Sequence, residues 1–124
     1  MAKVKGRGNR STEVKLAGIL RRNGIKGWRR HLPLQGKPDF AFHAEKLVIF
    51  VDGCFWHGCP KHCSIPVKNH AYWANKISRN RSRDRKNNRI LRENGWTVIR
   101  IWEHSLKYET RILSRLRRYL NIRE

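Results

Sequence analysis

Five consecutive apolar residues, at positions 47–51, constrain the fold of this chain more than any other feature of its sequence. The run Leu-Val-Ile-Phe-Val is rich in residues that favour extended structure and predicts a β-strand. A strand with one solvent-exposed face would alternate apolar and polar residues, so the unbroken run indicates that both faces of the strand are buried. We therefore expect this strand at the centre of a sheet.

Two further strands are predicted around it. Residues 40–42 (Phe-Ala-Phe) precede the central strand across a short polar turn at residues 44–46, so the two strands should pair as a hairpin. Residues 96–102 alternate enough to form a third strand. Residues 24–38 are rich in turn-forming residues, and we expect no regular element there.

Three segments show apolar residues at helical spacing: residues 12–23, 71–94 and 105–120. Ser11 or Thr12 can cap the start of the first helix. Asn-Gly pairs end the first two helices. The sequence therefore predicts a small α/β fold in which helices flank a central mixed sheet.

The length of 124 residues and the 39% of hydrophobic residues suit one compact core. We expect a basic flexible arm over residues 1–11 and a single domain over residues 12–124. The sequence has no run of about 18 apolar residues and no apolar secretory segment near its start. These features predict a cytoplasmic protein without a membrane span.

The chain is strongly basic. Twenty-nine Lys and Arg residues against nine Asp and Glu residues give a formal net charge of +20. Such an excess predicts a polyanionic partner, and nucleic acid suits scattered aromatic residues better than a membrane does. A structural protein of the ribosomal type would fit the charge equally well.

All three cysteines fall within ten residues, an odd number that argues against a disulfide framework. Cys54, Cys59, His62 and Cys63 offer thiolates and an imidazole, the ligands that Zn²⁺ prefers. Adjacent residues are awkward to place on one ion, so one of the last two could be free, and His104 is a candidate to complete the site. The alternative is a set of ordinary reduced cysteines.

The few acidic residues suggest a second site. Asp39 enters the first strand of the hairpin, Asp52 and His57 follow the central strand, and Asp84 shares a helical face with apolar residues. These four residues could converge at one end of the sheet, where they could bind a hard cation and supply a general base. Three of the four have a simpler reading: a Pro-Asp turn for Asp39, a surface residue for His57, and a buried ion pair with an arginine for Asp84.

The adjacent aromatic residues Phe55 and Trp56 lie between these two groups in the sequence. They could pack beneath the cysteine-rich loop or protrude as a wedge that unstacks bases. Local sequence favours packing for at least one of the two rings.

From Thr12 onward the chain resembles the very short patch repair endonucleases, bacterial DNA mismatch nucleases with a fold related to type II restriction enzymes. The resemblance rests on these strings: Gly36-Lys37-Pro38-Asp39-Phe40, Gly53-Cys54-Phe55-Trp56-His57, Tyr72-Trp73 with Lys76-Ile77, Asn80 with Arg83-Asp84-Arg85, and Gly95-Trp96-Thr97-Val98 with Trp102-Glu103. The string Gly-Cys-Phe-Trp-His is highly specific.

The resemblance implies a Mg²⁺-dependent endonuclease, restriction-endonuclease-like in fold, that nicks one strand of double-stranded DNA beside a T:G mismatch. The resemblance implies that Asp39 and the Val51 carbonyl bind Mg²⁺. It implies His57 as the general base, Asp84 as its acidic partner and Glu13 as a further acid near the site. Phe55 and Trp56 would intercalate next to the mismatch. The implied structural zinc lies on Cys54, Cys59, His104 and His62, with Cys63 as the alternative to His62. Asp52 and Val51 depart from the family pattern, which leaves open whether Asp52 itself contacts Mg²⁺.

Residues 76–92 contain eight Lys or Arg residues in seventeen, and Lys76, Arg79 and Arg83 among them are expected to follow DNA phosphates. We expect a monomer that could contact other mismatch-repair proteins. Two alternatives remain: a zinc-stabilised nucleic-acid-binding module without catalysis, and a restriction-type endonuclease that cuts paired DNA.

Overall fold

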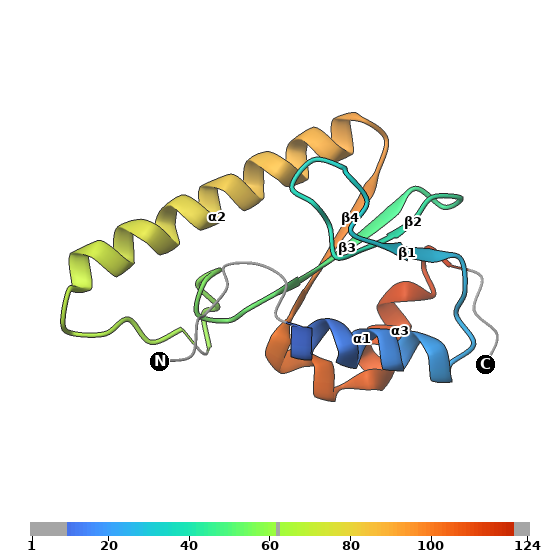
Figure 1. The fold of residues 1–124 in the computed structure, drawn as a ribbon, viewed down its shortest axis with the longest axis horizontal. Helices are drawn as coiled ribbons and strands as arrows, with labels where there is room; N and C mark the ends of the chain where they lie inside the picture. Colours follow the sequence, from blue (N-terminus) through green and yellow to red (C-terminus); the bar gives the residue numbers. More distant parts are fainter. Residues whose placement is uncertain (1–9, 62, 121–124) are drawn as a thin grey trace.

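The computed structural model describes residues 10–61 and 63–120 of the chain (Figure 1). The elements in chain order are α1 (Arg10–Arg22), β1 (Trp28–Arg30), β2 (Phe40–Phe42), β3 (Leu47–Asp52), α2 (His70–Glu93), β4 (Thr97–Trp102), the 3₁₀ helix η1 (Glu103–Lys107) and α3 (Glu109–Leu116). Within the described ranges, no helix combines the length and apolar composition needed to cross a membrane.

The four strands form one mixed sheet in the order β1-β2-β3-β4. The first three pair antiparallel, whereas β3 and β4 pair parallel, with α2 as the crossover between them. All six residues of β3 are buried. The prediction of a central strand covered on both faces is therefore confirmed, as is the hairpin of β2 and β3.

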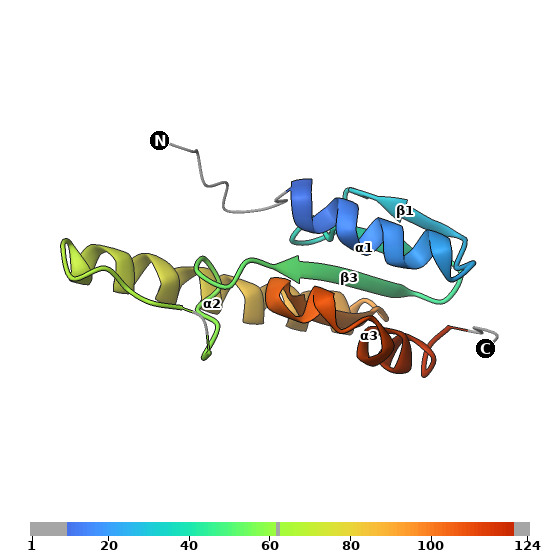
Figure 2. The same cartoon turned by 90° about the horizontal axis from the view of Figure 1, so that it is seen from below.

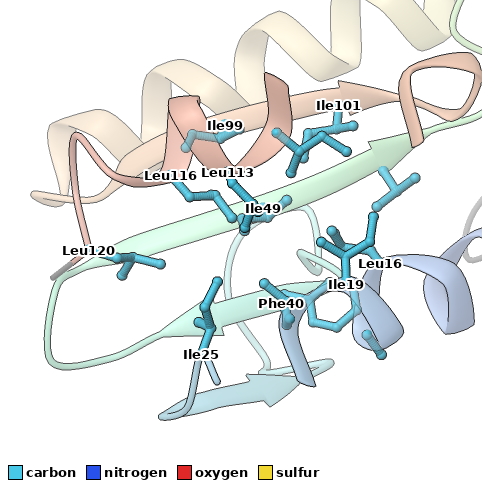
Figure 3. Packing of buried hydrophobic residues seen from close by; sticks show 14 of the residues in the cluster. Leu16, Ile19, Ile25, Phe40, Ile49, Ile99, Ile101, Leu113, Leu116 and Leu120 are labelled. Atoms are coloured by element: carbon cyan, nitrogen blue, oxygen red, sulfur yellow. The ribbon is translucent and has the colours of Figure 1, made fainter. Parts of the chain in front are cut away.

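Helices cover the two faces of the sheet unequally, with α1 and α3 on one face and α2 on the other (Figure 1). The larger core lies beneath α1 and α3, and Ile49 of β3 packs there against residues of both helices (Figure 3). Val48 and Phe50 point to the opposite face, where they join a smaller cluster with Leu91 of α2. The first half of α2 extends beyond the end of the sheet in both views (Figure 2).

One strand was missed by the prediction. Residues 28–30 were expected in a turn-rich stretch, but they form β1 and pair with β2, with Arg29 opposite Ala41. The strand has three residues, two of them exposed arginines, and it lies at the edge of the sheet. A strand this short and this polar gives almost no periodic signal, and only its pairing with β2 defines it.

The prediction of one helix over residues 105–120 was wrong. A 3₁₀ turn, η1, is followed by the shorter helix α3, and Tyr108 separates them with φ −106° and ψ 67°, outside the helical region. The apolar spacing continues across this break because Leu106 and Ile112 are both buried. Periodicity of burial alone therefore could not reveal the break.

The boundaries of α1 and α2 lie close to those predicted. Helix α1 begins at Arg10, two residues before the expected domain start, and α2 begins at His70 after Asn69, which has φ 60°. Residues 1–9 of the predicted basic arm lie outside the described residues.

Candidate active site and metal-binding groups

A pocket of about 680 Å³ opens where β2 begins and β3 ends, on the face of the sheet that α2 covers. Because β2 and β3 are antiparallel, the first residue before β2 lies beside the last residues of β3. Predicted site residues from four segments line this pocket: Asp39, Val51, Asp52, Trp56, His57, Lys76, Arg83 and Asp84. The predicted convergence of acids and imidazole at one end of the sheet is thus what the structure shows.

Asp39 lies at the base of the pocket and is only 3% exposed. Its Oδ2 accepts a hydrogen bond from the Val51 backbone N–H at 2.7 Å, whereas Oδ1 is buried and has no hydrogen-bond partner among the described residues. Burial, opposed by that hydrogen bond, raises the pKa of Asp39 to about 6. A buried carboxylate oxygen without a partner is costly, and a bound cation would satisfy it.

The surroundings of Asp39 fit a hard divalent cation. Mg²⁺ binds carboxylate and carbonyl oxygen and is commonly held by one or two carboxylates. Asp39 supplies such an oxygen, and Val51, the residue expected to add its carbonyl, lines the same pocket.

His57 and Asp84 form a hydrogen-bonded pair in the same pocket as Asp39. His57 belongs to the loop after β3 and Asp84 to the middle of α2, and His57 Nδ1 lies 2.5 Å from Asp84 Oδ2. Burial opposes protonation of the ring, but the hydrogen bond to Asp84 and the charge of Asp52 outweigh it and raise the pKa of His57. A carboxylate on Nδ1 fixes the ring and leaves Nε2 to act on a second group.

Asp52 is held by an arginine that sequence analysis did not single out. Both Asp52 oxygens accept hydrogen bonds from Arg100 Nη1, at 2.9 and 3.1 Å. Asp52 Oδ1 also lies 3.9 Å from His57 Nδ1. Burial raises the pKa of Asp52, and the charge of Arg100 partly offsets this effect.

Arg100 could have been found from one signal. It is the one charged residue of β4, lies between apolar neighbours, and stands directly opposite Phe50 in the register of β3. Residues that alternate with the core-facing Ile99 and Ile101 must face α2 and the pocket. A charged residue at such a half-buried position usually has a partner of opposite charge.

Glu13, expected near the site from the family resemblance, is 3% exposed in α1. Its Oε1 accepts a hydrogen bond from Arg30 Nη2 and lies 2.9 Å from His31 Nε2. Single oxygen or nitrogen atoms of Glu13, His31 and Asp39 lie within 4.8 Å of one another. Glu13 therefore lies close to Asp39, but it does not line the pocket itself.

The cysteine-rich loop brings a second set of ligands together, separate from the acidic pocket. His104 Nδ1 lies 3.3 Å from Cys54 Sγ and 3.6 Å from Cys59 Sγ. A tetrahedral zinc ion, with bonds of about 2.3 Å to sulfur and about 2.0 Å to nitrogen, sets such ligands roughly 3.5 Å apart. These three residues therefore have the spacing of three zinc ligands, and burial raises the pKa of the Cys54 thiol to about 11.

Sequence analysis left the fourth zinc ligand open between the adjacent residues His62 and Cys63. Cys63 Sγ lies 3.6 Å from the Phe55 carbonyl oxygen, and the group of three potential ligands does not include Cys63. His62 lies outside the described residues. The preference for His62 over Cys63 stays a prediction.

Phe55 and Trp56 pack with Trp73 of α2 in a cluster of three mutually edge-on rings. Their centroids are 5.3 to 5.7 Å apart, and all three residues are half-buried. Lys76 Nζ lies 5.5 Å from the Trp56 ring, and Asn80 donates a hydrogen bond to the Trp56 carbonyl. This arrangement agrees with the packing that local sequence favoured.

The predicted phosphate-binding residues lie on α2, and Lys76, Arg79 and Arg83 are all exposed. Arg83 Nη2 donates to Asn80 Oδ1 at 2.7 Å, so one end of this arginine is fixed beside the pocket. The basic side of α2 thus borders the acidic site, as a polyanionic substrate would require.

A small α/β domain with a buried carboxylate and an aspartate-held histidine, beside a basic helix, has the features of enzymes that act on nucleic acid. Residues 1–64 match the family model described as "DNA mismatch endonuclease Vsr". The type II nicking enzyme V.XorIIP of Xanthomonas oryzae is 34% identical over 116 residues, which cover 91% of this chain and 84% of that protein. The chain belongs to the DNA mismatch endonuclease Vsr family.

Two further relatives match over shorter stretches. The type II nicking enzyme V.NaeI of Lentzea aerocolonigenes is 52% identical over 68 residues, 55% of this chain and 41% of that protein. The DNA mismatch endonuclease Vsr of Escherichia coli is 37% identical over 98 residues, 77% of this chain and 62% of that protein. The chain therefore spans less than two thirds of the length of these two relatives.

Proposed function

We propose that this chain is a strand-nicking DNA endonuclease that hydrolyses a phosphodiester bond next to a T:G mismatch. The observation that carries the proposal is the His57–Asp84 hydrogen bond in the same pocket as the unpaired Asp39 oxygen. Support for a mismatch substrate comes from the names of the matched family and of the Escherichia coli relative. The T:G pair itself follows from the family resemblance.

His57 is proposed as the general base. Asp84 holds Nδ1 at 2.5 Å, so Nε2 is the nitrogen that can accept a proton from the attacking water. Asp84 stabilises the imidazolium that forms when the proton arrives. Asp39 and the Val51 carbonyl are proposed to hold Mg²⁺, which when bound would neutralise charge on the phosphate and polarise it towards attack.

The remaining groups are proposed to position the DNA. Lys76, Arg79 and Arg83 bind phosphates, and Phe55 and Trp56 insert beside the mismatch after leaving the ring cluster with Trp73. Zn²⁺ on Cys54, Cys59, His104 and His62 braces the loop that carries His57. We further propose that the sheet and its flanking helices represent a restriction-endonuclease-like fold.

The test uses duplexes that differ only in one base pair. Purified protein with Mg²⁺ should nick one strand of the T:G duplex, and Asp39→Ala should abolish nicking without weakening DNA binding. Cleavage of perfectly paired DNA at one sequence would favour a restriction-type activity, which the name "Type II nicking enzyme" of two relatives fits only loosely. Tight binding without any cleavage would favour a binding module.

A further inference from the structure

We propose that Arg100 is a built-in cation of the active site, which keeps a divalent ion out of the Asp52–His57–Asp84 group. The site then holds a single divalent ion, at Asp39. This inference rests on the proposed function for the ion at Asp39, but the exclusion of an ion by Arg100 is separate from it.

The Asp52–His57–Asp84 group has the ligand spacing of a metal site, since one potential ligand atom from each residue lies within 4.8 Å of the others. However, the four carboxylate oxygens of Asp52 and Asp84 already lie close to Arg100 or His57. Arg100 Nη1 donates to both oxygens of Asp52 and lies 3.7 Å from Asp84 Oδ1. His57 Nδ1 contacts the remaining oxygen, Asp84 Oδ2.

A divalent ion in this group would lie close to the guanidinium. Mg²⁺ binds oxygen at about 2.0–2.1 Å, so an ion on Asp52 Oδ1 would lie no more than about 5 Å from Arg100 Nη1. Two cations at that distance repel strongly in a partly buried site. The ion would also have to replace the hydrogen bonds that Arg100 makes to the same oxygens.

Arg100 is fixed where it is by contacts outside the acidic group. Its Nε donates to Asn88 Oδ1 at 2.7 Å, and its guanidinium carbon lies 4.0 Å from the centroid of the Phe50 ring. The side chain is 18% exposed. Movement away from Asp52 would therefore break the contacts to α2 and to β3 as well.

Asp39 provides the contrast within the same pocket. Its Oδ1 is buried without a hydrogen-bond partner among the described residues, and no arginine contacts either of its oxygens there. The pocket thus contains one carboxylate with an oxygen free for a cation and two whose oxygens already lie close to Arg100 or His57. Arg100 supplies fixed positive charge where a two-metal site would need a second ion.

The experiment counts bound Mn²⁺ by electron paramagnetic resonance on the full chain, with zinc content measured so that the cysteine site is accounted for. Wild type should bind one Mn²⁺, and Asp39→Asn none. Arg100→Gln, which removes the charge, should gain one ion over wild type. Arg100→Lys, which keeps a cation, should not.

The inference is decided by the difference in the number of bound Mn²⁺ ions between Arg100→Gln and wild type. The proposed function is tested separately, by whether the ion bound to wild type is lost in Asp39→Asn. Two ions in wild type, or no gain in a folded Arg100→Gln chain, would overturn the role of Arg100. If Arg100→Gln fails to fold by circular dichroism, the counts in wild type and Arg100→Lys decide: one ion in each supports the inference, and two in either contradicts it.

Discussion

His57 Nδ1 lies 2.5 Å from Asp84 Oδ2, although 27 positions separate the two residues in the chain. The loop after β3 and the helix α2 each supply one partner. Nothing in local structure would bring the two together, so the pair depends on how the loop packs against α2.

This pair gives the first prediction. Asp84→Asn should lower the nicking rate about 10²- to 10⁴-fold, because an amide neither holds the imidazole in the right tautomer nor stabilises its charge. DNA affinity should change little. The matched control is Glu93→Gln, the same chemical change at an exposed position of the same helix. Equal rates for the two variants would remove Asp84 from the mechanism.

The second prediction concerns the zinc ligands. Cys59→Ser should lose bound zinc and lower the melting temperature, since a structural ion contributes directly to folding. Cys63→Ser should keep its zinc if His62 is the fourth ligand. Elemental analysis and thermal unfolding of both variants provide the measurement. Zinc-free wild-type protein of full stability would contradict this assignment.

Gly58 gives the third prediction because it holds the loop tightly against α2. It has φ +67°, and a Cβ there would lie 2.9 Å from Ile77 Cγ2 and from Arg81 Cδ. Gly24 has φ +69° but nothing within 4 Å of its Cβ position, so Gly24→Ala is a matched control.

Gly24→Ala should lose about 1–2 kcal/mol of unfolding free energy through its backbone conformation alone. Gly58→Ala should lose about 1–3 kcal/mol more through overpacking. Chemical denaturation measures both variants. Equal losses would show that the loop can move away from α2 without cost.

The fourth prediction is a pH dependence. Glu109 of α3 accepts hydrogen bonds from Arg22 at 2.5 Å and from Asn23 at 2.8 Å, and these contacts lower the pKa of Glu109 below its usual 4.5. Its stabilising effect is therefore complete above pH 4.5 and is lost as the pH falls through the lowered value.

The measurement compares the free energy of unfolding of wild type and Glu109→Gln at about pH 7 and about pH 3. Wild type should be the more stable at the higher pH, and the difference should shrink at the lower one. Glu45→Gln, in the exposed turn between β2 and β3, is the control. A difference that grows on acidification would contradict the assigned sign.

The fifth prediction tests the basic face of α2. Arg79 is exposed, and Arg79→Gln should weaken binding to mismatched and paired duplexes by the same factor. The slope of log affinity against log salt should fall by about 0.9 if one phosphate contact is lost. A loss confined to the mismatched duplex would instead assign Arg79 to recognition of the lesion.

Sequence patterns predicted the parts of the fold that depend on local burial. The apolar run of β3, the hairpin with β2 and the long helix α2 all have strong periodic signals. The edge strand β1 had no such signal, because its three residues are defined only by pairing. The break at Tyr108 was hidden because burial continues across it.

The candidate site shows the same division. Asp39, Asp52, His57 and Asp84 were predicted to converge because they lie at a strand end, in the loop after the central strand or on an inward helical face. Arg100 was missed because the search for chemistry followed acids and imidazoles, whereas the residue that fixes Asp52 is a cation on a neighbouring strand. Partners of that kind become visible only when the strand register is known.

The parallel pairing of β3 with β4 has one more consequence. His104 and Arg100 reach their partners near the end of β3 only after the chain has passed through the whole of α2 and returned. A nascent chain that has folded as far as residue 93 holds neither complete group. The hold of Arg100 on Asp52 and the contact of His104 with Cys54 therefore form only once β4 has paired with β3, so both groups depend on completion of the sheet.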